Sequence, residues 1–339
     1  MRRETVVAIQ RTFSTATVLG AMVAGAPSFA LAHHSDASYN RDTVVAFEGQ
    51  VVRYIWRNPH VQIFVETENA AGERIEWEIE TGSTPIMLRS GWTRDLVSPG
   101  DTVSVRLHPE RDTGRTRAIL NVIETTDGRQ WMQIEDDVEA TGSAASLAGI
   151  WKGTNASNIN RQLGRAVLTP AAEAARTSYD DLTHRTVAAC LPNPPPRHIA
   201  SATYLSQIEI FEDTVILRSE IFDVMRTVYM DGRAHPENGE RTNQGHSIGW
   251  WEEDTLVVDT ALFADHPSGN GRGGVPSGPN KHLIERYSLS EDGTRAFVDV
   301  RLEDSDYLAE PFTGRVEMIY QPHLQLYRYD CDPDAMQLR

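Results

Sequence analysis

The chain has 339 residues, a formal net charge of −16 at pH 7 and only two cysteines. A chain this acidic is repelled by nucleic acids and by anionic membrane surfaces, so we expect no nucleic-acid partner. Its length is sufficient for two domains of ordinary size.

Residues 1–32 have the pattern of a signal peptide. Three arginines lie within the first eleven residues, and residues 13–32 are apolar, uncharged and end in Ala-Leu-Ala, a small-x-small pattern typical of signal-peptidase sites. A membrane anchor is the alternative, but the run is short and interrupted by glycine and proline, and no second span follows. We therefore expect a periplasmic or secreted protein, cut after Ala32 or after Ala30, with no membrane span once the leader is removed. Without the leader the net charge changes from −16 to −18, because the leader holds three arginines and one glutamate.

Residues 33–140 predict a small β domain. Alternating and β-branched runs predict five strands, at residues 44–54, 61–65, 75–80, 102–107 and 117–124. A short helix that starts at Thr84-Pro85 falls between the third and fourth strands. Five strands with one helix in this place is the order of an OB-type barrel, and a small sandwich is the competing interpretation.

Residues 147–339 predict a second, larger β domain, after a small, polar linker at residues 141–146. One short helix is predicted at residues 168–177, with Thr169-Pro170 at its start. Nine runs predict strands, at residues 208–211, 215–219, 225–230, 247–251, 256–260, 283–288, 296–302, 315–321 and 324–329. Their number and the tight turns between them indicate an antiparallel barrel or half-barrel. The Gly/Pro/Ser-rich residues 266–280 are too long for a simple hairpin and are predicted to form a mobile flap.

The two cysteines, Cys190 and Cys331, both lie in the second domain. A single pair in an oxidising compartment most simply forms one disulfide. The bond would close a loop of about 140 residues, which chain entropy values at several kcal/mol.

The segment Gly245-His-Ser-Ile-Gly249 matches G-x-S-x-G, the nucleophile elbow of α/β-hydrolases. That motif needs a buried strand before the serine and a helix of small residues after it. Here a polar loop precedes it, and Trp250-Trp251 and a turn follow. We therefore place His246 and Ser247 at the start of a strand, and keep a hydrolase or isomerase that uses His246 as an alternative function.

Charged residues inside otherwise apolar strands suggest a different site. Arg226 and Glu285 are of this kind, and such charges either face solvent or point into the barrel, where they must be paired. The second case marks a ligand pocket. We therefore favour binding over catalysis, with a small, largely apolar ligand in the second barrel and Arg226, Asp231, His246 and Glu285 as its polar contacts.

The histidines that follow the predicted cleavage site suggest copper. After a cut behind Ala32, His33 offers its α-amine and its imidazole to one metal ion, and such nitrogens suit Cu(II). His34 is adjacent, and His60 or His108 can supply a further nitrogen. A copper site at His33, His34 and His60 is thus a second hypothesis, against a polar N-terminus that binds no metal.

Several motifs resemble known protein families. The N-terminal motifs are His33-His-Ser35, Trp56-Arg-Asn-Pro-His60, Trp77-Glu-Ile-Glu-Thr-Gly-Ser83, Arg89-Ser-Gly-Trp-Thr-Arg94 and Pro99-Gly-Asp101. They resemble a family of small exported bacterial proteins of unknown function whose mature chain starts near His-His-Ser. The C-terminal motifs are Tyr229-Met-Asp-Gly-Arg-Ala-His-Pro236, Gly245-His-Ser-Ile-Gly249, Trp251-Glu-Glu-Asp-Thr-Leu-Val-Val-Asp-Thr260 and Glu285-Arg286. They resemble a second uncharacterised group of exported proteins, and Leu147-Ala-Gly-Ile-Trp151 is similar to the Gly-x-Trp start of lipocalin-type barrels. These resemblances imply export and bring no activity, cofactor or catalytic residue.

Overall fold

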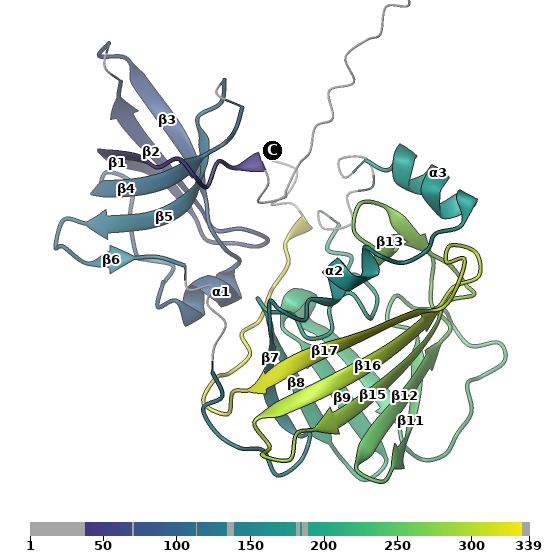
Figure 1. Cartoon of the computed structure of the whole chain (residues 1–339). Helices are drawn as coiled ribbons and strands as arrows, with labels where there is room; N and C mark the ends of the chain where they lie inside the picture. Colours follow the sequence, from purple (N-terminus) through teal and green to yellow (C-terminus); the bar gives the residue numbers. More distant parts are fainter. Residues whose placement is uncertain are drawn as a thin grey trace, which may run out of the picture. The chain divides into compact units, whose positions relative to one another are not determined.

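The structure, a computed structural model, describes residues 38–69, 71–112, 114–133, 139–180, 184 and 189–333. Within these ranges strands predominate, and they form a small N-terminal barrel and a larger C-terminal barrel (Figure 1). The expected fold class is therefore confirmed.

The N-terminal barrel has five strands among the described residues. They are β1 (Val45–Ile55), β2 (Gln62–Glu68), β3 (Arg74–Glu80), β4 (Thr102–Pro109) and β5 (Arg117–Thr125). Antiparallel pairing runs through β3-β2-β1-β4-β5, and a parallel pairing of β3 with β5 closes the sheet. Helix α1 (Thr84–Arg89) lies between β3 and β4 in the chain, and the short β6 (Gln130–Trp131) extends β5. This is the OB-like order, and closure of the sheet rules out the sandwich.

The alternation of β4 shows why these residues form a barrel. Val103, Val105 and Leu107 are buried in one apolar core, whereas the residues between them are exposed. Trp92, which follows α1, is 1% exposed in the same core and donates its indole N–H to the carbonyl oxygen of Met132 at 3.2 Å. The core therefore holds the helix and the chain after β6 against the sheet.

The C-terminal barrel is closed, and its nine strands follow one another in the order β10-β11-β12-β15-β16-β17-β7-β8-β9 within the described residues. They are β7 (Gly149–Gly153), β8 (Leu205–Ile210), β9 (Thr214–Ser219), β10 (Val224–Tyr229), β11 (His246–Glu252), β12 (Thr255–Ala261), β15 (His282–Leu289), β16 (Arg295–Glu303) and β17 (Phe312–Tyr320). The remaining elements are α2 (Ile159–Leu163), α3 (Pro170–Ser178), the 3-10 turn η2 (Ile221–Asp223) and the separate hairpin of β13 (His266–Gly271) and β14 (Val275–Ser277). Figure 1 shows β11, β12, β15, β16 and β17 side by side in one wall of this barrel.

The structure differs from the sequence-based predictions in β7 and α2, which were not predicted, and in three further details. The β10–β11 pair is parallel, because the sixteen-residue connection 230–245 returns the chain before β11 begins. Residues 324–329 form no strand, since β17 already pairs with β16 and β7 and leaves no free edge. Residues 266–280 contain the β13–β14 hairpin, and His266 and Asn270 in it are at most 1% exposed. This segment is therefore packed against its surroundings rather than an open flap.

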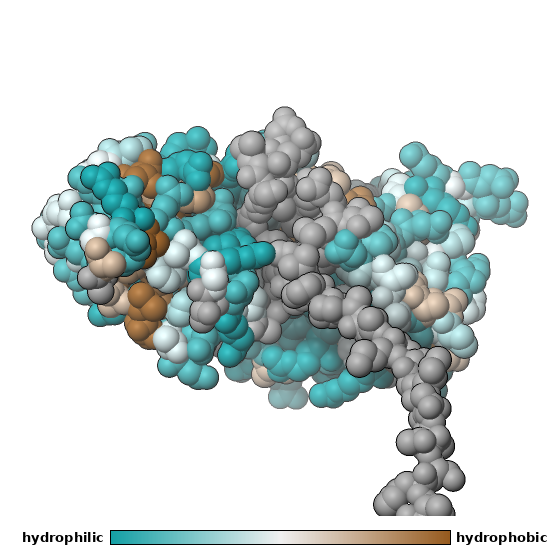
Figure 2. All heavy atoms as spheres, turned by 90° about the horizontal axis from the view of Figure 1, so that it is seen from above, coloured by the Kyte–Doolittle hydropathy of each residue, from teal (hydrophilic) through white to brown (hydrophobic). Residues whose placement is uncertain are grey.

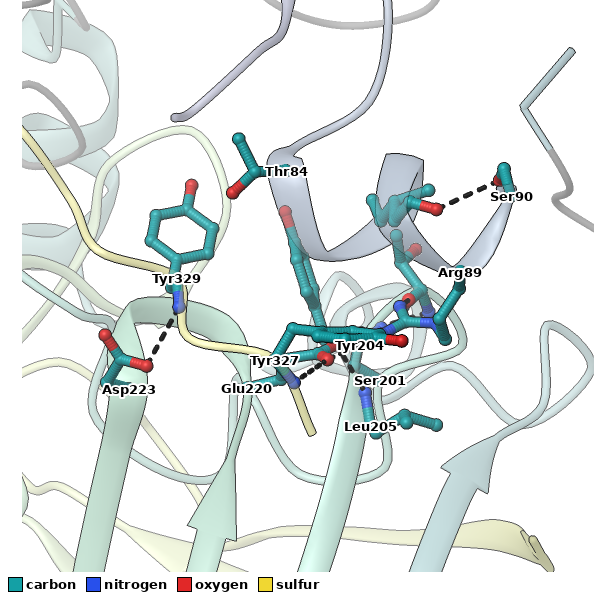
Figure 3. A network of polar contacts seen from close by, with 12 residues as sticks. Thr84, Arg89, Ser90, Ser201, Tyr204, Leu205, Glu220, Asp223, Tyr327 and Tyr329 are labelled. Carbon is teal, nitrogen blue, oxygen red and sulfur yellow. Dashed lines mark hydrogen bonds and ion pairs between the residues drawn. The ribbon is translucent and has the colours of Figure 1, made fainter. Parts of the chain in front are cut away.

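A C-terminal segment, residues 321–331, runs from β17 to the disulfide between Cys190 and Cys331. Its backbone is bound by side chains of the larger barrel. The backbone N–H of Tyr327 donates to Glu220 and that of Tyr329 to Asp223, each at 2.9 Å (Figure 3). The carboxylates of Glu220 and Asp223 thus accept the backbone hydrogen bonds that a neighbouring strand would otherwise accept.

The same buried carboxylate joins the two barrels, which belong to one compact unit. Arg89, the last residue of α1, lies next to Glu220 (Figure 3) and donates to both of its carboxylate oxygens at 2.6 Å. It also donates to the carbonyl oxygen of Thr203 at 2.9 Å. Asn58 of the N-terminal barrel donates its side-chain amide to the carbonyl oxygen of Tyr329. The C-terminal segment therefore contacts both barrels.

The visible face in Figure 2 is mostly hydrophilic, with apolar side chains confined to small areas. This distribution agrees with the acidic composition. The helices among the described residues are too short or too polar to cross a lipid bilayer.

Candidate functional site

The register of β11, β12 and β15 brings three polar side chains to one face of the sheet. Ile248 pairs with Asp259, and Asp259 pairs with Ile284. Side chains two residues apart on a strand share a face, so His246 and His282 lie on the same side as Asp259. This is the outer face, because the alternate residues of these strands form the barrel core.

Asp259 is the centre of a group of hydrogen bonds on this face. Its Oδ1 atom lies 2.7 Å from Nε2 of His282 and 3.1 Å from Nε2 of His235. His235 comes from the connection after β10, and its Nδ1 lies 2.9 Å from Nδ1 of His246. We call these four residues, His235, His246, Asp259 and His282, the histidine–aspartate cluster.

The cluster moves the pKa values of its two outer histidines in opposite directions. The hydrogen bond to Asp259 raises the pKa of His282 against the effect of partial burial. Partial burial, with the charges of His235 and Arg233, lowers the pKa of His246. Burial opposes ionisation of Asp259, but hydrogen bonds from His282 and His235 outweigh it and lower the pKa of this carboxyl. At neutral pH, Asp259 is thus ionised and His246 is neutral.

These contacts fix the tautomers of His235 and His246. Ionised Asp259 can only accept, so His235 donates its Nε2 proton to it. An imidazole whose proton is on Nε2 has a lone pair on Nδ1, so in this tautomer of His235 the Nδ1 atom accepts the Nδ1 proton of His246. The assignment leaves Nε2 of His246 as an unprotonated base on a partly exposed side chain.

Two side chains from the end of β10 and the turn after it complete the surroundings of His246. The Tyr229 ring stacks on the imidazole with centroids 5.3 Å apart, and the Arg233 guanidinium lies 4.0 Å from the Tyr229 ring centre. Asp231 binds this guanidinium through both carboxylate oxygens. Asp231 therefore holds Arg233 at the rim of the cluster.

The barrel interior contains a separate polar group. Arg226 of β10 is 4% exposed and pairs with fully buried Glu285 of β15 at 2.6 and 2.8 Å. The hydroxyl of Tyr287 donates to the same carboxylate at 2.8 Å. These two predicted site residues thus point into the barrel and neutralise each other, as buried charges must.

The predicted ligand contacts divide between the two sides of the wall. Arg226 and Glu285 face inwards, whereas His246 lies on the outer face and Asp231 lies in an exposed turn. The structure therefore does not bring the four predicted contacts together, and their role in binding a ligand stays a prediction. A cavity beside Arg226 and Tyr287 has a volume of about 30 Å³, which is room for one or two water molecules. An apolar ligand inside this barrel stays a prediction, and it requires interior side chains to move.

Ser247 of the G-x-S-x-G segment points away from His246. It is 1% exposed and its hydroxyl contacts the Thr260 hydroxyl at 2.8 Å. Both glycines have structural reasons: Gly245 has a φ of +72°, and a Cβ at Gly249 would lie 2.7 Å from a Val228 methyl group. The strand starts at His246 as expected, and the segment is not a nucleophile elbow.

Of the three residues in the copper hypothesis, only His60 lies within the described residues. His33 and His34 lie outside the described residues. His60 is partly buried beside β2, and its Nδ1 contacts the carbonyl oxygen of Thr81 at 2.9 Å and lies 3.4 Å from Glu80. His108 binds elsewhere in the barrel, to Thr43 and Asn121. Across the described part of the chain, no group of three or more His, Cys, Asp or Glu residues has an arrangement that can hold a metal ion.

The cysteine prediction is confirmed by the disulfide between Cys190 and Cys331, which are 141 positions apart. The four ligand contacts predicted from the sequence, in contrast, included His246 but not His235, Asp259 or His282. Strand alternation could have identified Asp259 and His282. Once β11, β12 and β15 are paired in register, alternation places His246, Asp259 and His282 on the same face of the sheet. Sequence alone does not supply that register.

Comparison with known proteins adds a family match for the N-terminal part. Residues 21–119 match the model of a family described as "Family of unknown function (DUF6152)". No curated protein matches the chain. The match agrees with the resemblance of the N-terminal motifs to an uncharacterised family, and it ends before the histidine–aspartate cluster begins. It assigns no activity.

Proposed function

We propose that the chain is a hydrolase in which His246 activates a water molecule at the outer face of the C-terminal barrel. The observation that carries this proposal is the chain of contacts from Asp259 through His235 to His246. A carboxylate that orients an imidazole, which in turn orients the base, is the arrangement general-base catalysis needs.

The opposite pKa shifts supply both partners of acid–base chemistry. His246 is neutral and can take a proton, while His282 retains its proton to higher pH and can donate one. Two titratable groups whose surroundings separate their pKa values are suited to the roles of base and acid. Arg233 adds a positive charge near the site where an oxyanion develops.

The proposed reaction balances without a co-reactant. Nε2 of His246 takes a proton from water, and the water oxygen attacks the carbonyl carbon of an ester. The resulting tetrahedral oxyanion collapses, the ester C–O bond breaks, and the leaving alkoxide receives a proton from the His282 imidazolium. His246 then releases its proton to solvent and His282 takes one up, which restores both groups. Water serves as the nucleophile because Ser247, the adjacent hydroxyl in the sequence, faces the interior.

The disulfide supports the further proposal that this chemistry takes place outside the cytoplasm. Disulfides persist in oxidising compartments, and the predicted leader would deliver the chain to one. N-terminal sequencing of the exported protein tests this part independently.

The test of the proposed function compares His246→Gln and His282→Gln with wild type on p-nitrophenyl acetate and p-nitrophenyl octanoate. General-base catalysis contributes about 10²–10⁴-fold, so kcat/KM falls by at least a hundredfold in His246→Gln. The matched control is His323→Gln, because His323 is exposed and binds Thr141 outside the cluster. The control retains wild-type activity.

Two results would overturn the proposal. One is a kcat/KM in His246→Gln equal to that of wild type. The other is wild-type ester turnover no faster than buffer. Turnover of an enolisable ketone by proton exchange, in the absence of ester hydrolysis, would assign the same base to an isomerase instead.

A further inference from the structure

The outer face beside the histidine–aspartate cluster is apolar. Ile248 and Ile284 pair with Asp259 from its two sides, so each isoleucine side chain is a direct cross-strand neighbour of the carboxylate. Both are partly exposed. The ionised carboxylate of Asp259 thus lies between two partly exposed isoleucine side chains on the outer face of the barrel.

Trp250 continues this apolar surface along β11. It is the next residue after Ile248 on the same face, pairs with Val257 and is 41% exposed. Val257 is 1% exposed although it is absent from the barrel core, and its direct neighbours are Trp250 and Arg286. The burial of Val257 therefore comes from side chains on the outer face.

The Trp250 ring is held in place by polar contacts. Its indole N–H donates to Oε1 of Glu252 at 3.0 Å, and Arg286 donates to the other oxygen of Glu252 at 2.6 Å. An exposed indole that is fixed by a hydrogen bond presents a flat apolar surface at a reduced entropy cost of binding. We call Ile248, Ile284 and Trp250 the apolar platform.

The geometry of β11 sets the distance between His246, the proposed base, and Trp250 at the end of the apolar platform. Trp250 follows His246 by four residues, which corresponds to about 13 Å along an extended strand. A molecule whose reacting group lies at His246 can therefore reach the indole only with an apolar part of comparable length.

We propose, on the basis of the proposed function, that the substrate is an amphipathic carbonyl compound with an extended apolar tail. Its polar end lies between His246, His282 and Arg233, and its tail runs along β11 over Ile248 to Trp250. The tail is an acyl or arylalkyl group about 13 Å long. Trp250 thus determines specificity for chain length and takes no part in the chemistry.

The experiment uses the full chain and a matched pair of tryptophans. Trp251 is as exposed as Trp250, at 44%, but it lies on the opposite face of the strand and pairs with Leu256. In Trp250→Ala, KM for p-nitrophenyl octanoate rises about tenfold, while kcat and the hydrolysis of p-nitrophenyl acetate are unchanged. Trp251→Ala retains wild-type constants for both esters.

A binding measurement separates this inference from the proposed function. Titration with 4-octylphenol, which has no ester bond, quenches tryptophan fluorescence in wild type, in Trp251→Ala and in His246→Gln. The quenching is lost in Trp250→Ala. Binding of 4-octylphenol with wild-type affinity and quenching in Trp250→Ala would overturn the platform. Retained quenching in a His246→Gln variant with undiminished turnover would instead overturn the catalytic role of His246 alone.

Discussion

Asp259 controls the charge of its neighbours through one oxygen atom, which accepts from both His235 and His282. The raised pKa of His282 means that its pairing stabilises the fold fully below pH 6.5 and less as the pH rises through the folded value. The lowered pKa of Asp259 gives a contribution that is present above about pH 4 and lost in acid. The Asp259–His282 pair therefore contributes most to the stability of the barrel between about pH 4 and about pH 6.5.

Asp259→Asn removes this charge and nearly preserves the shape of the side chain. We expect the pKa of His282 to fall towards or below its ordinary value, because the hydrogen bond to an ionised carboxylate is gone. The cost in stability near pH 6 is about 1 kcal/mol, since the side chain of His282 is 40% exposed and solvent weakens the pair. Histidine ring resonances followed by NMR between pH 4 and 9 measure the first effect. An unchanged His282 titration in the variant would contradict this account of Asp259.

At the scale of strands, alternation in the sequence predicted most of the fold. The runs that become β4, β9, β12 and β16 contain apolar residues at every second position or in short β-branched stretches, and these patterns identify strands without knowledge of their partners. The position of α1 was likewise predicted from Thr84-Pro85.

The candidate site was predicted less well, because its residues meet across strands. Arg226 and Glu285 were recognised as charges in apolar strands, and their pairing inside the barrel follows from burial. His246 and Asp259 are thirteen positions apart and share a face only through the β11–β12 register. His235 reaches Asp259 from a long connection, and no local pattern encodes that approach.

The β13–β14 hairpin covers a buried amine whose charge depends on pH. Lys281 follows the hairpin, is 1% exposed and donates to the carbonyl oxygen of Gly269 at 3.1 Å. Burial lowers the pKa of Lys281 to about 7, although the charge of Asp304 opposes the shift. Above pH 7 the unfolded chain thus binds a proton that the folded chain has released.

Between pH 7 and 9 this difference makes the protein more stable as the pH rises, by up to about 1.4 kcal/mol per pH unit. Lys281→Met removes the ionisable group with little change in length, so the slope disappears. Denaturant unfolding at pH 7, 8 and 9 measures it, and Arg272→Met, at an exposed position of the same hairpin, is the control. An equal slope in wild type and Lys281→Met would show that the amine is not the source.

At the scale of the whole molecule, the C-terminal segment connects the two barrels. Glu220 is 1% exposed and binds Arg89 of α1 as well as the backbone of Tyr327. The pKa of Glu220 is raised by burial, and the Arg89 charge only partly compensates. Removal of Arg89 alone would therefore leave a buried carboxylate with less support, which is costlier than the loss of an exposed ion pair.

The disulfide fixes the end of this segment, because Cys331 follows directly after the residues that bind Asp223. In the variant with both Cys190→Ser and Cys331→Ser, the unfolded chain gains the entropy of a loop of about 140 residues, worth about 5 kcal/mol in the chain-entropy model. We expect the unfolding midpoint to fall, and trypsin to cleave first at Arg328, which lies within the released segment.

Denaturant titration of wild type with and without reductant, beside the double variant, measures the first effect, and mass spectrometry of early digestion products measures the second. Equal midpoints, or first cleavage within the barrels, would mean that contacts with Glu220 and Asp223 hold the segment without the covalent bond.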